Sequence, residues 1–127
     1  SNRHIQDAIQ YINQNYARHI GLEEIANHVY LSKHYFHRLF TQTVNCTPHE
    51  YIHMVRLRHA KELLRNSSLS VREIATSVGF ENDSYFIQLF KRSESTTPLA
   101  YRKKWNGTSY GADFSVCSKN IRTPVFP

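Results

Sequence analysis

Two residue patterns in this 127-residue sequence could support chemistry. The first is His49-Glu50-Tyr51-Ile52-His53, which has the HExxH spacing of zinc-dependent hydrolases and is followed by His59. Two histidines four residues apart on a helix share a face and can bind one zinc ion, with the glutamate as general base. The second pattern is a set of polar side chains that recur at helical spacing in two separate segments. It is typical of a surface that recognises a polar partner.

The zinc hydrolase is the weaker interpretation. In the longer HExxHxxGxxH motif a glycine ends the helix, so that the third histidine can return to the metal. Here Arg56 stands at that position, inside a continuing helical pattern. On an unbroken helix His59 lies about 9 Å beyond His53 and is rotated by roughly 120°, so the three rings cannot converge. Residues 47–50 also form a capping-box pattern, which gives Glu50 a structural role. We therefore expect no metal, no cofactor and no enzyme.

The polar segments belong to an internal repeat. Residues 22–51 and 71–101 share Glu-Ile-Ala and, after one extra residue in the second copy, Tyr-Phe, Leu-Phe, Thr-Pro and Tyr. Each copy has a short apolar-striped helix, a break, and a second helix with an aromatic stripe. Two short helices joined by a tight turn form a helix-turn-helix, although a helical hairpin used only for packing has the same outline. Because the outer faces match as well, the repetition favours a binding unit.

The outer face of the second helix in each copy carries the candidate base-reading residues. They are His34, His37 and Arg38 in the first copy, and Ser84, Ile87 and Gln88 in the second. Arginine can pair with guanine, glutamine with adenine, and isoleucine can contact the thymine methyl group, so these side chains suit the major groove of DNA. Phosphate contacts position a protein without reading sequence. The flanking residues suited to them are Lys33, Gln42, Asn82, Lys91 and Arg92.

A long helix is expected between the copies, over residues 47–66. About 18 helical residues rise roughly 27 Å, so the two second helices can reach successive major-groove segments on one face of DNA, whose turn is about 34 Å. The expected buried stripe is Tyr51, Ile52, Val55, Ala60, Leu63 and Leu64. The expected outer surface, which is either a basic contact surface or simply solvated, carries His53, Arg56, Arg58, Lys61 and Arg65.

The composition agrees with these predictions but does not decide between them. Sixteen Lys and Arg against ten Asp and Glu give a net charge of +6, which suits a polyanionic partner. No apolar run approaches the roughly 20 residues of a membrane span, so no membrane partner is expected. Two cysteines are too few for a disulfide framework, which favours the cytoplasm. A helical module that binds nucleic acid without reading sequence is the alternative. Against it, the Tyr and Phe residues fall on stripes expected to be buried, which leaves no aromatic platform for single-stranded RNA.

The chain resembles the DNA-binding domain of AraC/XylS transcription regulators over about residues 4–104. The resemblance implies about seven helices in two homeodomain-like units, with two readers of the major groove, and activation or repression of transcription through RNA polymerase. It also implies that the six candidate base-reading residues occupy base-contacting positions of the family. The segments that carry it are Ile25-Ala26, Tyr35-Phe36-x-x-Leu39-Phe40, Arg56-Leu57-x-x-Ala60-x-x-Leu63-Leu64, Ile74-Ala75-x-x-Val78-Gly79-Phe80-x-x-x-Ser84-Tyr85-Phe86-x-x-x-Phe90-Lys91 and Thr97-Pro98-x-x-Tyr101-Arg102.

We therefore predict an all-α protein that binds specific double-stranded DNA sequences and regulates transcription as a bacterial activator. It has a first helix-turn-helix subdomain at 1–46, a linker helix at 47–66, a second subdomain at 67–104 and a tail at 105–127. The role of the tail is left open, although residues 110–116 alternate as a short strand would. Family members commonly carry a sensory or dimerisation domain, for which this chain has no room, so a larger protein is expected.

The sequence departs from the family pattern at three positions. Asn45 and Ser95 stand where the family favours glycine after each recognition helix. Serine tolerates a left-handed backbone less well than asparagine does, so the second recognition helix could end differently. Tyr30 stands where the second copy has Gly79, so the first turn could be less regular.

Overall fold

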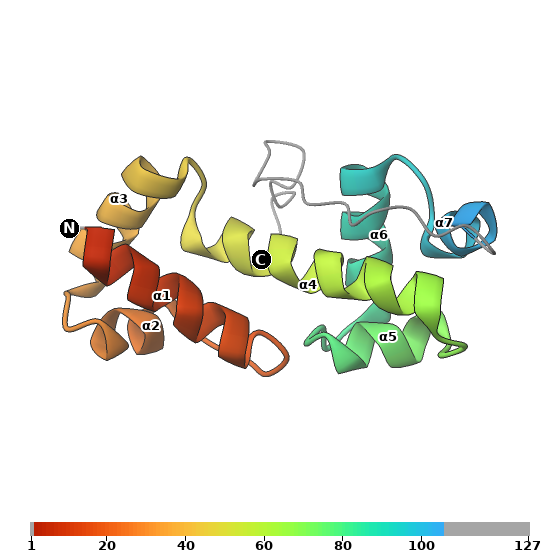
Figure 1. Cartoon of the computed structure of the whole chain (residues 1–127), viewed down its shortest axis with the longest axis horizontal. Coiled ribbons are helices and arrows are strands. Elements are labelled where there is room, and N and C mark those ends of the chain that lie inside the picture. The colour runs from red at the N-terminus through yellow and green to blue at the C-terminus, as the bar shows by residue number, and fades with distance from the viewer. Residues whose placement is uncertain (1, 106–127) are drawn as a thin grey trace.

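The computed structural model describes residues 2–105, which form seven helices and no strand (Figure 1). The prediction of an all-α protein built from two helix-turn-helix units is confirmed. The tail from residue 106 onward, with its alternating segment at 110–116, lies outside the described residues. The helices are α1 (Asn2–Asn15), α2 (Leu22–His28), α3 (Lys33–Val44), α4 (Pro48–Asn66), α5 (Val71–Ser77), α6 (Asp83–Glu94) and α7 (Pro98–Trp105).

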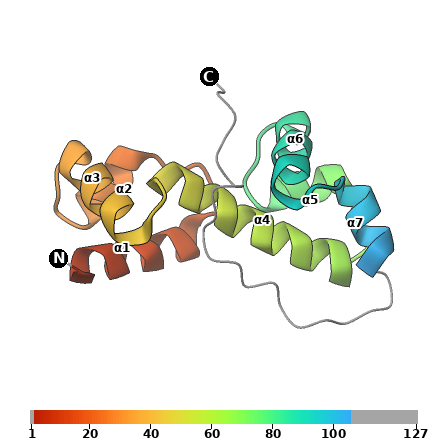
Figure 2. The same ribbon diagram turned by 90° about the horizontal axis from the view of Figure 1, so that it is seen from above.

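The long helix α4 runs between the two units. Helices α1, α2 and α3 are grouped at the end where α4 begins, and α5, α6 and α7 are grouped around its second half (Figures 1 and 2). In Figure 1, α3 and α6 both lie above α4, whereas α2 and α5 both lie below it. The second helices of both units therefore face the same side of the molecule. Among the described helices, none is both long enough and apolar enough to cross a membrane.

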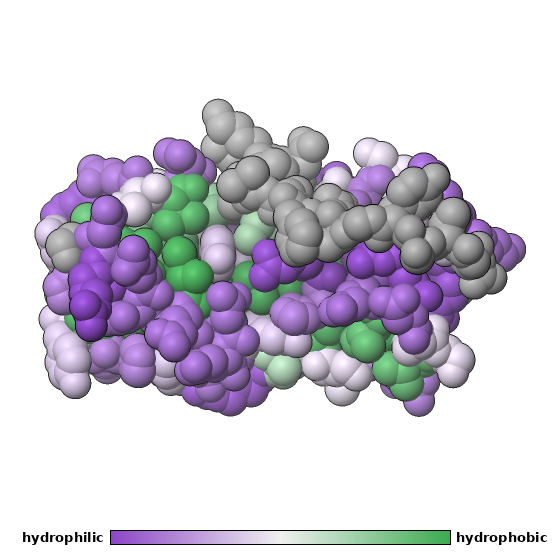
Figure 3. Space-filling model, viewed as in Figure 1, coloured by the Kyte–Doolittle hydropathy of each residue, from purple (hydrophilic) through white to green (hydrophobic). Residues whose placement is uncertain are grey.

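The core is one continuous cluster of apolar side chains contributed by both units and α4. The aromatic stripes of the repeat lie at its centre, because Phe36, Phe40, Phe86 and Phe90 are wholly buried. Truncating such a phenylalanine to alanine typically costs about 3–5 kcal/mol, so these side chains are a major source of stability. In Figure 3 the exposed face of α1 is mainly hydrophilic, whereas apolar patches show between the two units.

Side-chain caps fix where the connecting helices begin. At the start of α4, Thr47 Oγ1 accepts a hydrogen bond from the Glu50 amide (3.1 Å), and the Glu50 carboxylate accepts one from the Thr47 amide (2.9 Å). The predicted capping role of Glu50 is thus confirmed. Ser70 and Glu73 form the same reciprocal pair at the start of α5. A cap of this kind typically contributes about 1 kcal/mol and fixes the direction in which the chain enters the helix.

The turns between the two helices of each unit begin in the same way, although the second has one residue more, and contrary to the expectation Tyr30 does not make the first one less regular. Tyr30 has φ +63° and Gly79 has φ +108°, so both turns pass through a left-handed residue. The residue after each then donates to the alanine carbonyl of the preceding helix, over 3.0 Å for Leu31 and 2.9 Å for Phe80. A tyrosine in this conformation is strained, but the turn hydrogen bonds are kept.

Helices α3 and α6, the second helix of each unit, also end alike. Asn45 has φ +69° and Ser95 has φ +61°, and each donates its amide to a carbonyl of the last helical turn. The expectation that Ser95 would change the end of the second helix is therefore wrong. Asn45 and Ser95 each stand two positions before the Thr-Pro pair at the start of the next helix, and Ser95 adopts the left-handed conformation despite the lower preference of serine for it.

The prediction that the basic residues of α4 form an exposed outer surface is largely wrong. His53 and Lys61 are 2% and 3% exposed, and Arg56 and Arg65 are half-buried. Lys61 pairs with Glu94 of α6 across 3.2 Å, and Arg65 donates to the Tyr101 hydroxyl of α7 across 2.6 Å. Elements of both units cover α4 from several sides, so its polar positions serve contacts between helices. A helical periodicity identifies one buried face, but it does not identify a second one.

Candidate DNA-binding surface

Helix α3 presents the first predicted reading face. Ser32 Oγ accepts a hydrogen bond from the Tyr35 amide (3.3 Å) and starts the helix, and the buried Phe36 and Phe40 fix its rotation about its own axis. With those two rings in the core, the opposite side of the helix faces solvent. The three predicted base-reading residues of this unit, His34, His37 and Arg38, are all exposed.

Tyr35 supports the first reading face, a role that the sequence analysis missed. Its side chain is 43% exposed, and the Arg38 guanidinium lies 5.7 Å from the centre of its ring. A cation–π contact of this kind restrains an otherwise flexible arginine. Tyr30 in the preceding turn is 91% exposed. The expectation that all aromatic residues of the repeats are buried is therefore wrong for these two tyrosines. Tyr35 is absent from the side chains that form the core or pack against it, whereas Tyr85 at the equivalent position of the second unit packs against the core.

Helix α6 presents the second face. Asn82 Oδ1 accepts hydrogen bonds from the amides of Ser84 (2.8 Å) and Tyr85 (3.2 Å), which starts the helix. Ser84 and Gln88 are exposed, whereas Ile87 is half-buried and packs against the core. Among the three predicted base-reading residues of this helix, Ile87 therefore uses part of its side chain to pack against the core, and only the rest is open to a partner. Asparagine directly before a helical pattern is a capping signal, and it could have revealed the role of Asn82 in the sequence.

The residues predicted to contact phosphate lie at the edges of the two faces. Lys33, Gln42, Lys91 and Arg92 are exposed, at the start or toward the end of their helices. Asn82 is also exposed, but its side-chain oxygen is occupied by the helix cap. The four other side chains can reach a partner without breaking a contact of the fold described above.

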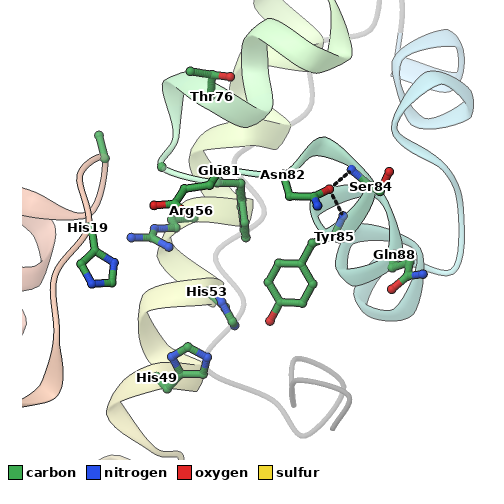
Figure 4. A pocket seen from close by; sticks show the side chains of 13 residues that line it. His19, His49, His53, Arg56, Thr76, Glu81, Asn82, Ser84, Tyr85 and Gln88 are labelled. Atoms are coloured by element: carbon green, nitrogen blue, oxygen red, sulfur yellow. Dashed lines mark hydrogen bonds between the residues drawn. The ribbon is translucent and has the colours of Figure 1, made fainter. Parts of the chain in front are cut away.

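A groove that the sequence analysis did not predict lies between the two units (Figure 4). Its volume is about 740 Å³, and it includes the flank of α6 that carries Ser84 and Gln88. Burial, together with the nearby Arg56 guanidinium, lowers the pKa of His49. Burial beside His49 lowers the pKa of His53 to about 3, and the buried His53 Nδ1 atom has no hydrogen-bond partner among residues 2–105. Both rings are therefore neutral at pH 7, so they add no positive charge to the groove.

The HExxH residues are used for packing and capping. The His49 and His53 rings are 4.3 Å apart, whereas His59 stacks on Tyr16 with ring centres 4.2 Å apart and planes 6° from parallel. Glu50 caps α4, as shown above. Between residues 2 and 105, no three side chains of His, Cys, Asp or Glu gather at one point as metal ligands would. As helical geometry predicts, the His59 ring points away from the rings of His49 and His53.

The two faces share their construction. Each recognition helix starts at a side-chain cap, buries two phenylalanines, turns polar residues outward and ends at a left-handed residue. Both lie on the same side of α4 (Figure 1). Pairs of exposed polar helices of this form enter the major groove of DNA. The fold and this surface together define a tandem helix-turn-helix DNA-binding domain.

Comparison with known proteins agrees with the assignment of a helix-turn-helix DNA-binding domain. The family described as the helix-turn-helix domain matches residues 25–104. The regulatory protein PocR of Salmonella typhimurium is 35% identical over 106 residues, which are 84% of this chain and 35% of PocR. The lactose operon transcription activator of Staphylococcus xylosus is 32% identical over 101 residues, 80% of this chain and 36% of that protein. The crystallised DNA-binding domain of the global transcriptional factor AdpA, in complex with a target DNA, has a TM-score of 0.76 at 25% identity, covering 80% of this chain and 91% of that chain.

The chain belongs to this helix-turn-helix family, in the AraC/XylS group of transcription regulators, as the sequence motifs predicted. It is a sequence-specific DNA-binding module of transcription regulation. Both curated relatives carry regulatory names, and the chain spans about a third of the length of each.

Proposed function

We propose that α3 and α6 read base edges in two successive major-groove segments on one face of the duplex. The observation that carries this proposal is that both helices are capped, rotated and ended alike and face the same side of α4. His34, His37 and Arg38 read one segment, and Ser84, Gln88 and the exposed part of Ile87 read the other. Lys33, Gln42, Asn82, Lys91 and Arg92 hold the flanking phosphates.

We further propose that the chain is the DNA-binding part of a longer bacterial regulator. The chain matches about a third of each curated relative, so about two thirds of each relative lies outside the match. In the longer protein we assign this remaining part to a sensory or dimerisation domain. The name of the Staphylococcus xylosus relative, a transcription activator, supports activation as the mode of regulation. To this the proposal adds contact with RNA polymerase, in the cytoplasm where bacterial DNA is transcribed. In this assignment the chain is a regulator and not an enzyme.

Selection from random duplexes tests the reading function. The expected result is one preferred site of about 20 base pairs that binds at least about a hundredfold tighter than scrambled DNA. Hydroxyl-radical footprinting of that site should show two protected segments on one face, separated by about one helical turn. Protection of a single segment would contradict the two-reader arrangement.

The alternative is a module that binds nucleic acid without reading its sequence, and the exposed rings of Tyr30 and Tyr35 are the observation in its favour. Such rings can stack on unpaired bases. The same competition assay distinguishes the two functions, provided that single-stranded DNA is included as a competitor. Equal affinity for selected, scrambled and single-stranded DNA would favour the alternative.

A further inference from the structure

Arg56 joins α4 to the loop that follows α1. Its Nε donates to the Tyr16 carbonyl across 2.7 Å, and its Nη2 donates to the Arg18 carbonyl across 3.0 Å. The guanidinium group is half-buried, so competition from water for these two hydrogen bonds is reduced. The first unit is therefore held at the middle of α4 as well as at its start, where α3 leads into it.

The carbonyl groups that receive Arg56 are themselves held in place. The Arg18 side chain forms an ion pair with Glu24 of α2, and Glu24 also accepts a hydrogen bond from the Tyr11 hydroxyl of α1. The ring of His59, on α4, stacks on Tyr16. These contacts restrain the loop from the side of α2 and from the side of α4. The Tyr16 and Arg18 carbonyl groups are therefore already in position to accept hydrogen bonds from Arg56.

The second unit contacts the same arginine. The Arg56 guanidinium lies 5.6 Å from the centre of the Phe80 ring, in the turn between α5 and α6. Gly79 packs so closely that a Cβ atom there would lie 2.6 Å from the Tyr16 carbonyl oxygen and 2.8 Å from Arg56 Nε. Glycine is thus required here by space as well as by φ. Figure 4 shows Arg56 between the His19 loop of the first unit and Glu81 of the second.

We propose that the junction of Arg56, Gly79 and the Tyr16 carbonyl sets the distance and rotation between the two recognition helices, and so selects the half-site spacing of the operator. Helix α4 packs against α5 and α7 of the second unit, whereas its main helix contact in the first unit is with α3, which leads into it. The Arg56 junction attaches the first unit to α4 at a further point, and we expect it to keep that unit from turning about the α3–α4 connection. Arg56 is then a positioning residue, because it affects DNA through the two units that it holds.

The first test requires no DNA. Residual dipolar couplings measured in solution should fit one alignment tensor for both units of the unaltered chain. In Arg56→Met, which keeps the aliphatic stem but removes the donors, each unit should keep its own couplings and require a separate tensor. Arg58→Met removes the same charge from α4 two residues away and should behave like the unaltered chain. A single shared tensor in Arg56→Met would overturn the proposal.

The second test rests on the proposed two-reader function and uses the selected operator with its spacer changed by one base pair, which is about 3.4 Å and about 34° of rotation. The unaltered chain and Arg58→Met should lose at least about tenfold in affinity for either change. Arg56→Met should lose less than about threefold. An equal loss of affinity at every spacing would show that Arg56 acts on general binding and would overturn the proposal.

Two further variants cover the case in which Arg56→Met unfolds. Arg56→Lys keeps the charge but cannot donate to both carbonyl groups, so an intermediate spacing profile is expected. Gly79→Ala forces the units apart at the close contact and should shift or broaden the preferred spacing, and unchanged profiles in both would overturn the proposal. If the unaltered chain itself shows no preferred spacing, the two-reader function fails, and the dipolar couplings still decide whether Arg56 holds the units together.

Discussion

Lys61 on α4 and Glu94 on α6 form an ion pair inside the protein, with Lys61 Nζ 3.2 Å from Glu94 Oε2. The Lys61 side chain is 4% exposed and that of Glu94 is 18% exposed. The pair joins the linker helix to the end of the second recognition helix. A charge removed from water is tolerated only with such a partner, so the two residues are expected to depend on each other.

Replacing Glu94 alone should be more harmful than replacing both members of the pair. Glu94→Gln leaves the buried ammonium group without its carboxylate and should lower the free energy of unfolding by roughly 3 kcal/mol. Lys61→Met together with Glu94→Gln removes both charges and should cost clearly less. Urea denaturation followed by circular dichroism gives both values, and a double variant less stable than Glu94→Gln would refute the dependence.

Acidification should destabilise the protein through His53. Burial lowers the pKa of His53 from 6.5 to about 3, so between these values the unfolded chain binds a proton that the folded chain excludes. Stability is therefore complete above pH 6.5 and falls as the pH drops toward 3, by at most about 1.4 kcal/mol per pH unit from this group. His53→Gln should reduce the slope of the unfolding free energy against pH.

A matched control for that measurement is His37→Gln on the exposed face of α3, which should leave the slope unchanged. Burial also lowers the pKa values of His49 and His59, so part of the slope persists in His53→Gln. Parallel pH profiles for the unaltered chain and His53→Gln would contradict the assignment of the slope to His53.

Tyr30→Gly should stabilise the protein. The tyrosine has φ +63°, which costs a residue with a side chain about 1 kcal/mol relative to glycine, and its ring is 91% exposed and contributes little burial. The expected gain in the free energy of unfolding is therefore about 1 kcal/mol. The opposite exchange at the equivalent position, Gly79→Ala, should destabilise, since a Cβ there meets the Tyr16 carbonyl. Equal effects at both turns would contradict this account.

Arg38→Ala should separate base reading from phosphate contact. We expect it to cost about 1–3 kcal/mol in binding to the selected operator and to relax preference at one base position. Lys91→Ala should weaken binding to selected and scrambled DNA alike, and reduce the slope of log affinity against log salt by about 1. Competition binding at several salt concentrations measures both. Equal losses of Arg38→Ala on both kinds of DNA would assign Arg38 to the phosphates.

The sequence by itself determined the repeated unit. The aromatic stripe with Phe36 and Phe40, its copy with Phe86 and Phe90, and the capping box at Thr47 all follow from local periodicity and local hydrogen bonding. These signals come from residues within one or two helical turns of each other. The exposed positions of the recognition helices follow too, because fixing the buried face of a helix leaves the other face to solvent.

Only the tertiary structure decided what the polar residues of α4 do. His53, Arg56 and Lys61 had the spacing of a solvated face, yet they contact elements up to 40 residues away in the sequence. Because helix α4 contacts elements of both units, more than one of its sides is buried. The second buried side is determined by residues far away in the sequence, which a local pattern cannot predict. For the same reason, the groove between the units and the contact of Gly79 with Arg56 became visible only once both repeats had packed around α4.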